Sequence, residues 1–472
     1  MALETLLVKV KNAVSNRFDA VRTSSTAAAA NIKPTSSSSK KKSANVGVLA
    51  FEIAGLMSKL LHLWQSLSDA NIVRLRNESV SLEGVHKIVS NDDAFLLGLA
   101  CAEITQNLRL LANSVSRFTS KCDDATLRSF DRFFHDFADS GRDLHNWTLS
   151  EKEMECRNKR VERLVTVTAT LHREMDELTI METGLRKAVA NLQSCQQEIS
   201  NNPSLETSLK EQKILDLQHK ILWQRQEVKY LKEKSLWNRT FDTAVSILAR
   251  SIFTTLARIK LVFGLAQFPS SLPRCLSASA AVHPLKNLTE TGKDFLVTKN
   301  AFFESNSKLL KPPPSTLGAA GLALHYANLI IVMDKMIKSP QLVGVDARDD
   351  LYSMLPNSVR SALRGRLRGV GFTASDPSLA GEWREALGRI LGWLSPLAQN
   401  MMKWQSERSF EQQNYNMAPK TNVMLLQTLY FANKDKTEAA ITELLVGLNY
   451  IWRFEREMTA KALFACNNFI SS

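Results

Sequence analysis

VERLVTVTATLHREMDELTIMETGLRKAVANLQSCQQEI is the sequence of residues 161–199, and it carries the clearest structural signal in the chain. Leucine or isoleucine returns every seven residues along it, at Leu164, Leu171, Leu178, Leu185, Leu192 and Ile199. A companion series is mixed in character: Val161, Thr168, Met175, Glu182, Val189 and Gln196. A seven-residue apolar repeat is typical of helices that pack side by side. One strong and one weak seam therefore predict a long helix in coiled-coil-like packing.

The heptad pattern stops at SNNPS, residues 200–204, because Pro203 cannot continue a helix. Helical spacing resumes after it, with apolar residues at Ile214, Leu217, Ile221, Val228 and Leu231. Two helices joined by a short loop fold most simply into an antiparallel hairpin, here over residues 151–236. A parallel homodimer is the alternative, although Glu182 and Gln196 weaken a long parallel seam. We therefore favour a monomer, and the oligomeric state stays open.

Helical periodicity and a shortage of turn residues extend this fold class to the whole chain. Its 472 residues contain only 18 Gly and 13 Pro, whereas an all-β chain needs many more turn signals. We predict an all-α protein of several helical bundles with one long antiparallel helical hairpin. Five segments follow: an amphipathic helix plus a basic, Ser-rich flexible linker at 1–43, an N-terminal helical domain at 44–150, the hairpin or coiled coil at 151–236, a helix plus a Pro-containing loop region at 237–311, and a C-terminal helical domain at 312–465.

Residues 1–43 differ from the rest of the chain in charge and in pattern. They hold eight Lys and Arg residues against two acidic residues, in a chain of net charge +13. Apolar residues at helical spacing predict a face that contacts a membrane or a partner: Leu3, Leu6, Leu7, Val10, Val14 and Phe18. A basic tail favours anionic partners, with a solvated tail as the alternative. Lys40, Lys41 and Lys42 form a short candidate nuclear import signal.

None of the common catalytic motifs occurs in the sequence. HExxH, GxxxxGK[ST] and GxSxG are absent, and no histidine lies at metal-ligand spacing from a cysteine or another histidine. His325, in the apolar run LALHYANLIIVMD, is either a buried acid–base group or a core histidine bonded to a backbone carbonyl, and we favour the second. We therefore predict no catalytic residue, no metal ligand and no cofactor, and that the chain is not an enzyme.

A row of arginines is a candidate for phosphate binding. Arg360, Arg364 and Arg368 are four residues apart, so a helix over SVRSALRGRLRG would align their guanidinium groups on one face. Such a row can bind phosphate groups. Most such rows are solvated helix faces, and Gly365 weakens this helix.

Cysteine usage and the N-terminal residues predict an intracellular protein. The six cysteines form no CxxC pair and no disulfide framework, and no signal peptide is visible. We expect a nuclear or cytoplasmic protein that is not secreted, with the plasma-membrane periphery as a further location. Its expected partners are other proteins and an anionic membrane surface, and we expect no nucleic-acid partner.

Two stretches resemble a known plant family. Residues 46–101 contain VGVLAFEIA, QSLSDANIVRLR and EGVHKIVSND, and residues 316–368 begin with TLGAAGLALHYAN. These strings resemble the two domains of unknown function in the plant PSK-simulator family. The C-terminal TLYFANKDKTEAAITELLVGLNYI is similar to that family as well.

The resemblance implies a plant growth regulator linked to phytosulfokine peptide-hormone signalling, without known enzymatic activity and without known site residues. We therefore expect a non-enzymatic regulatory or scaffold protein. The alternative is a peripheral membrane protein that binds anionic lipid through its N-terminal amphipathic basic segment. Several relatives start Met-Gly and look myristoylated, whereas position 2 here is Ala2, so we expect no myristoyl anchor.

Overall fold

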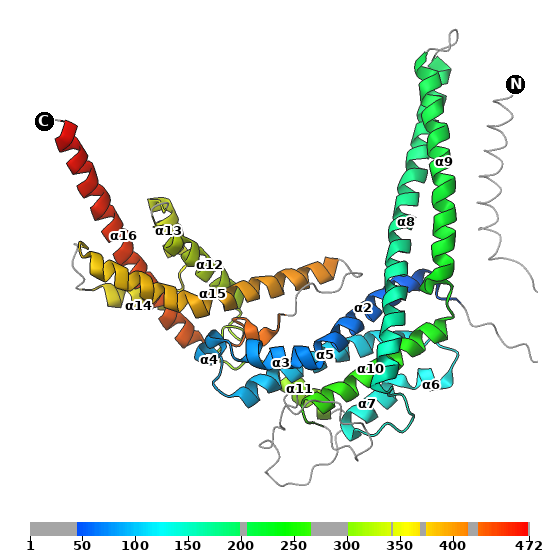
Figure 1. Ribbon diagram of the computed structural model, residues 1–472, viewed down its shortest axis with the longest axis horizontal. Coiled ribbons are helices and arrows are strands. Elements are labelled where there is room, and N and C mark those ends of the chain that lie inside the picture. The colour runs from blue at the N-terminus through cyan, green and yellow to red at the C-terminus, as the bar shows by residue number, and fades with distance from the viewer. Residues whose placement is uncertain are drawn as a thin grey trace, which may run out of the picture. The chain divides into compact units, whose positions relative to one another are not determined.

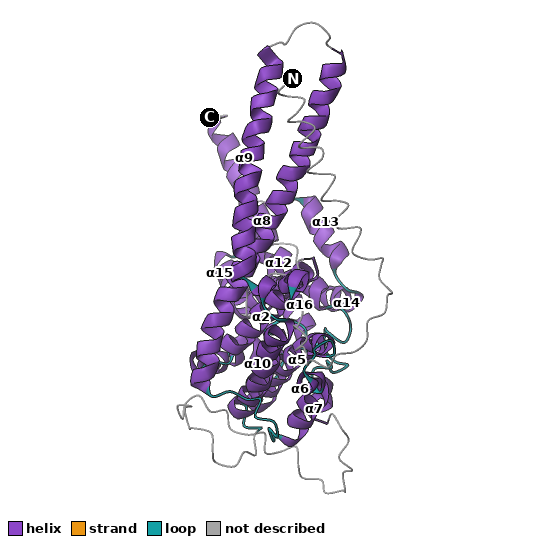
Figure 2. Ribbon diagram, turned by 90° about the vertical axis from the view of Figure 1, so that its right-hand side faces the viewer, coloured by secondary structure: helices purple, strands orange, loops and turns teal. Residues whose placement is uncertain are grey.

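The computed structural model describes residues 45–198, 205–265, 301–340, 343–368, 374–413 and 423–470. Helices make up most of these residues, and no strand forms within them (Figure 2). Their extended pairings are two isolated bridges, Asn45 with Thr240 and Thr316 with Asn433. The predicted all-α class is thus confirmed. Ser43–Ser472 forms one compact unit, and Met1–Lys42 is a separate unit that lies outside the described residues.

The N-terminal bundle is built around α5 (Asp93–Thr119), which α2 (Ala50–Ser66) and α10 (Phe241–Val262) contact (Figure 1). The Asp92 side chain starts α5 by accepting a hydrogen bond from the Ala94 backbone N–H at 2.9 Å, which satisfies one of the free amides of the first turn. Short helices complete this bundle: α3 (Asp69–Arg74), α4 (Glu83–Ile88), α6 (Ala125–Arg128) and α7 (Phe130–Ser140), with single 3₁₀ turns at Gly47–Leu49 and Leu236–Asn238 and a short π-helix at Leu75–Val80.

Aromatic side chains fill the core between α7 and α10. Phe130 and Phe134 are stacked with ring centroids 5.7 Å apart, and Phe253 packs edge-on against both. Phe303 of α11 (Ala301–Leu309) stacks on Phe134 at 5.4 Å and is fully buried. Aromatic pairs of this geometry add to the free energy gained by burying the rings. The short helix α11 therefore belongs to the N-terminal core, although its sequence neighbourhood predicted loops.

Helices α8 (Glu151–Glu198) and α9 (Leu205–Lys234) lie side by side and run antiparallel (Figures 1 and 2). Glu182 of α8 pairs with Arg225 of α9 at 2.7 Å. Farther down α8, Thr168 accepts a hydrogen bond from the Leu236 backbone N–H, just beyond the end of α9. Residue numbers thus fall along α8 while they rise along α9.

The leucine seam of α8 is buried only near the N-terminal bundle. Leu164 and Leu171 are buried, whereas Leu178, Leu185 and Leu192 are half-buried. The predicted turn at Pro203 lies outside the described residues, so the closing of the hairpin stays a prediction.

The C-terminal bundle has a second core. Helix α15 (Pro377–Gln413) contacts both α12 (Ala323–Lys338) and α16 (Lys434–Ile470), and α14 (Asn357–Leu367) packs on α16. Buried side chains shared by these helices include Tyr326, Ile330, Leu394 and Leu444. The bundle also contains α13 (Val345–Met354) and a single turn at Leu425–Gln427.

The two cores meet where α4 contacts α15 and where residues 425–431 enter the first core. A Cβ added to Gly84 of α4 would lie 2.3 Å from the Trp393 carbonyl oxygen of α15, so this approach needs glycine. Leu425, Leu426 and Phe431 pack into the N-terminal core. These contacts make the two bundles parts of one unit.

Two helical segments, Gly47–Ser66 and Asp93–Thr119, are long and apolar enough to cross a membrane by length and composition alone. Both also pack into the N-terminal core. Because a core helix meets the same criteria, this is weak evidence for a membrane span.

Candidate functional site

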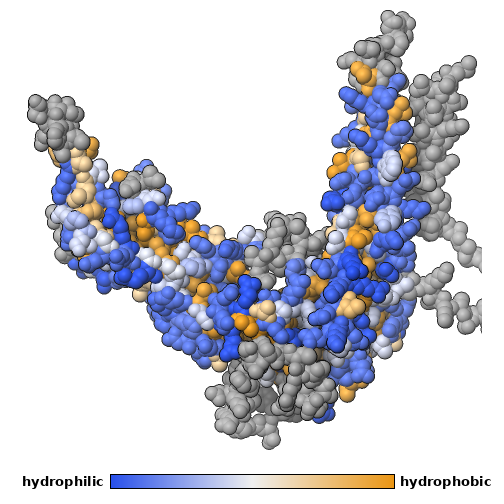
Figure 3. Space-filling model, viewed as in Figure 1, coloured by the Kyte–Doolittle hydropathy of each residue, from blue (hydrophilic) through white to orange (hydrophobic). Residues whose placement is uncertain are grey.

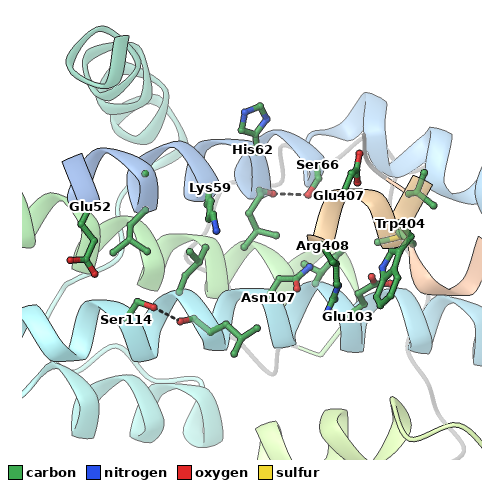
Figure 4. A pocket seen from close by; sticks show the side chains of 18 of the residues that line it. Glu52, Lys59, His62, Ser66, Glu103, Asn107, Ser114, Trp404, Glu407 and Arg408 are labelled. Carbon is green, nitrogen blue, oxygen red and sulfur yellow. Dashed lines mark hydrogen bonds between the residues drawn. The ribbon is translucent and has the colours of Figure 1, made fainter. Parts of the chain in front are cut away.

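A pocket of about 330 Å³ opens between α2, α5 and α15, at the junction of the two bundles (Figure 4). This volume is within the range of small-molecule sites. The lining combines apolar and charged side chains from distant parts of the sequence. The apolar ones include Leu56, Leu63, Ile104, Leu110, Leu111, Trp404 and Met424, and the charged ones are Glu52, Lys59, Glu103, Arg117, Glu407 and Arg408.

Glu103 is the buried acid of this pocket, with only 7% of its surface exposed. Its carboxylate accepts a hydrogen bond from the Leu425 backbone N–H at 2.8 Å. Burial raises the pKa of Glu103 to about 7, against the opposing effects of the Leu425 and Trp404 hydrogen bonds and the charge of Arg408. Because Leu425 is 322 positions away in the chain, this bond ties α5 to the segment that precedes α16.

Most other polar groups of the pocket are bonded within the protein. Arg117 pairs with Glu52 at 3.3 Å, and the hydroxyl groups of Ser66 and Ser114 donate to backbone carbonyls of their own helices. Arg408 instead stacks over the Trp404 ring at 4.2 Å and makes no hydrogen bond or ion pair with the residues that the structure describes. His62 points away from the pocket (Figure 4).

The hydroxyl groups of the pocket lining are engaged with the backbone. A nucleophile needs an adjacent base, and the two serine hydroxyls of the lining donate to backbone carbonyls instead. Nor do the described residues contain a group of three or more His, Cys, Asp or Glu side chains that could hold a metal ion. The distinctive polar groups of the pocket are one buried acid, Glu103, and one stacked guanidinium, Arg408.

A second candidate site is the side of α9 that faces away from α8. Leu215, Leu222, Trp223 and Tyr230 are exposed there by 50%, 57%, 77% and 54%, and we call them the outer face of α9. They form two pairs spaced by seven residues, so they share one side of the helix. The space-filling view shows hydrophobic residues on the surface of this helix pair (Figure 3).

The predicted arginine row is partly used inside the C-terminal bundle. Arg364 donates to the Tyr352 hydroxyl at 2.8 Å, and Arg360 donates to the Ser353 carbonyl at 2.7 Å. Both contacts hold α14 to α13. Arg368 is exposed and lies where the backbone leaves the helix in an extended conformation. Phosphate binding by these three residues stays a prediction.

The other predicted residues have different outcomes. Leu3, Leu6, Leu7, Val10, Val14, Phe18 and Lys40, Lys41 and Lys42 lie outside the described residues. His325 Nε2 lies 2.9 Å from the Met354 carbonyl oxygen, so the backbone-carbonyl partner that we favoured is present, although the residue is half-buried and not part of the core.

Sequence reasoning missed the pocket, although one signal of it was present. Glu103 is a lone acid in the apolar run AFLLGLACAEI, residues 94–104. A charge in such a run is rarely fully buried without a partner. Its partner Leu425, however, contributes a backbone N–H, which no residue pattern reveals.

Two domain families match parts of the chain, and both are described as being of unknown function. Residues 48–104 match DUF3475, and residues 316–403 match DUF668. Glu103 lies at the end of the first match, and Trp404 directly follows the second. The pocket is therefore lined by residues from the ends of both domains.

Three relatives come from Arabidopsis thaliana. Protein PSK SIMULATOR 1 is 28% identical over 91% of this chain and 59% of its own length. Protein PSK SIMULATOR 3 is 28% identical over 87% of this chain and 56% of its own length. Protein PSK SIMULATOR 2 is 27% identical over 87% of this chain and 60% of its own length. The chain thus spans less than two thirds of the length of these relatives. No solved structure matches it significantly. With both domains and an alignment over most of its length, the chain is a homologue of the PSK SIMULATOR proteins.

Proposed function

We propose that this chain is a non-enzymatic regulatory scaffold that promotes plant growth in phytosulfokine signalling. The names of its homologues support the link to that signalling, and neither those names nor the descriptions of the two domains mention an enzyme. A scaffold acts by holding partners, so it needs a surface that its own fold leaves uncovered.

The observation that carries the proposal is the outer face of α9. Burying a large apolar side chain is worth roughly 1.5–3 kcal/mol, yet Trp223 remains 77% exposed and Leu222 57% exposed. Val228 and Leu231 already pack the opposite side of α9 against Leu171 of α8. The helix is therefore apolar on two sides, which a helix with a single packing partner does not require.

The occupant that fits this face best is a helix of a protein partner with its own apolar stripe. The seven-residue spacing of Leu215 to Leu222 and of Trp223 to Tyr230 matches the repeat by which helices pack lengthwise. Exposed charges of both signs flank the face, among them Asp216, Lys220 and Lys229. Such flanking charges select the partner and its orientation.

The test is the growth response to phytosulfokine in plants that lack this protein. The wild-type chain should restore the response, and a chain with Leu222→Glu and Trp223→Glu should not. Ile180→Glu is the control, because Ile180 is an apolar residue that is 71% exposed but lies on α8. A full response with the double variant, at equal protein level, would contradict the proposal.

A second copy of the chain is an alternative occupant of the face, and it has a separate signature. Sedimentation equilibrium of the purified chain at micromolar concentration should show a monomer. If it shows a dimer that Leu222→Glu and Trp223→Glu dissociate, the face serves self-association and the partner proposal fails.

We propose peripheral binding to anionic membranes as a second function. It is supported by the sequence pattern of residues 3–21, whose apolar face runs from Leu3 to Phe18 beside Lys9, Lys11 and Arg17. The chain should float with phosphatidylserine vesicles and lose much of this binding in 1 M salt, where the Debye length is about 3 Å. Leu7→Asp with Val10→Asp should abolish it. Absence of binding at low salt would contradict this proposal.

A further inference from the structure

The polar groups of the pocket between α2, α5 and α15 differ in how far the protein itself satisfies them. Glu103 accepts from the Leu425 N–H, and Glu52 pairs with Arg117. Lys59 and Glu407 are engaged in interactions of their own. Glu103 and Glu52 thus each already accept from a donor of the protein, and a ligand cation would have to compete with the Leu425 N–H at Glu103 and with Arg117 at Glu52.

The donors that remain are Arg408 and Asn107. Neither makes a hydrogen bond with another described residue, and both reach into the space between α15 and α5 (Figure 4). The ring of Trp404 covers one plane of the Arg408 guanidinium at 4.2 Å. Stacking leaves the N–H groups at the edge of a guanidinium free, and they match a carboxylate or phosphate in geometry.

The rest of the lining is suited to an apolar body. Leu56 and Leu63 of α2 and Ile104 and Leu111 of α5 all line the pocket. Leu110 also lines it and is 53% exposed, so part of this apolar wall still meets solvent. An apolar chain or ring laid against these side chains would remove that surface from water, which is favourable.

We infer that this pocket binds a small amphipathic organic anion, with its apolar body against the leucines of α2 and α5 and its carboxylate or phosphate on Arg408 and Asn107. The site is independent of the outer face of α9, which lies on another helix pair. It therefore gives the scaffold a place for a small ligand next to the contact between its two domains.

Four probes with the same ten-carbon chain test the chemistry by isothermal titration on the full-length protein. They are decanoate, decyl phosphate, decan-1-ol and decyltrimethylammonium. We expect at least one of the two anions to bind about tenfold more tightly than the alcohol and the cation, as a charge-assisted hydrogen bond implies. The ratio between decanoate and decyl phosphate identifies the headgroup. If neither anion binds more tightly than decan-1-ol, the inference is overturned.

Two variants and one control locate the binding. Arg408→Gln should weaken the preferred anion about tenfold and leave decan-1-ol unchanged. Arg389→Gln is the matched control, because Arg389 is also exposed on α15 but pairs with Glu385 outside the pocket. Leu110→Asp should weaken the binding of decanoate, decyl phosphate and decan-1-ol, but not of the cation. Because Leu110 is exposed, this substitution should not prevent folding. Equal losses from Arg389→Gln and Arg408→Gln would contradict the assignment.

Discussion

Helices α5 and α9 have similar lengths, 27 and 30 residues, but they are surrounded very differently. Fifteen residues of α5 are buried, and α2, α7, α10 and α11 all contact it. Helix α9 instead buries Val228 and Leu231 against α8 and leaves its outer face in solvent. The apolar residues of α5 are thus mostly buried in the core, whereas the outer face of α9 stays exposed, as our proposal of a docking surface requires.

The strongest test of this contrast removes the same side chain from both helices. Leu108 of α5 is fully buried, and Leu222 of α9 is 57% exposed. Leu108→Ala should lower the free energy of unfolding by about 2–5 kcal/mol, because it leaves a cavity. Leu222→Ala should change it by less than about 0.5 kcal/mol. Urea denaturation measures both, and similar losses would mean that the outer face is covered in solution.

Glu103, which lines the pocket from α5, should make the free energy of unfolding depend on pH. Burial raises the pKa of Glu103 from 4.5 to about 7 in the folded protein. A carboxyl with a raised pKa favours the folded state below its unfolded pKa and loses this contribution as pH rises through 7.

The substitution Glu103→Gln puts a neutral side chain at this position and removes its contribution to the pH dependence of stability. The free energy of unfolding of the variant, relative to wild type, should therefore rise by about 2–3 kcal/mol between pH 5 and pH 8. Denaturation curves at the two pH values give this difference. If the difference in the free energy of unfolding between variant and wild type is the same at both pH values, the pKa of Glu103 is not raised in the folded protein.

Two glycines give the smallest and most local comparison. In α4, a Cβ at Gly84 would lie 2.3 Å from the Trp393 carbonyl oxygen, so Gly84→Ala should lower the free energy of unfolding by about 1–3 kcal/mol through overpacking. In α8, nothing lies within 4 Å of a Cβ at Gly184, so Gly184→Ala should stabilise by about 0.5–1 kcal/mol through helix propensity. Thermal melts of the two variants should shift in opposite directions.

The sequence predicted the long helices because their apolar residues repeat with the helical period. The seam of α8 is the best example, and Leu164 and Leu171 are buried where α8 meets the N-terminal bundle. Short α11 escaped prediction because nine residues carry too little periodicity next to proline-rich neighbours. Phe302 and Phe303 mark it only once Phe134 is known to be its neighbour.

The candidate sites were harder to predict than the fold. The outer face of α9 was hidden because Leu215 and Leu222 look like ordinary members of an apolar pattern until exposure is known. The pocket depends on Glu103 meeting Leu425 and on Arg408 lying over Trp404, at the junction of two bundles. Periodicity reports on local structure, so it cannot indicate such contacts between distant segments.

The most direct test of the account is amide hydrogen exchange of this chain, alone and in a complex purified from plant tissue. We predict added protection in α9 over residues 209–230, where the outer face would meet a partner helix, and unchanged protection in α5. Protection that appears in the N-terminal bundle, with none in α9, would contradict the claim that the outer face of α9 is the docking surface of this scaffold.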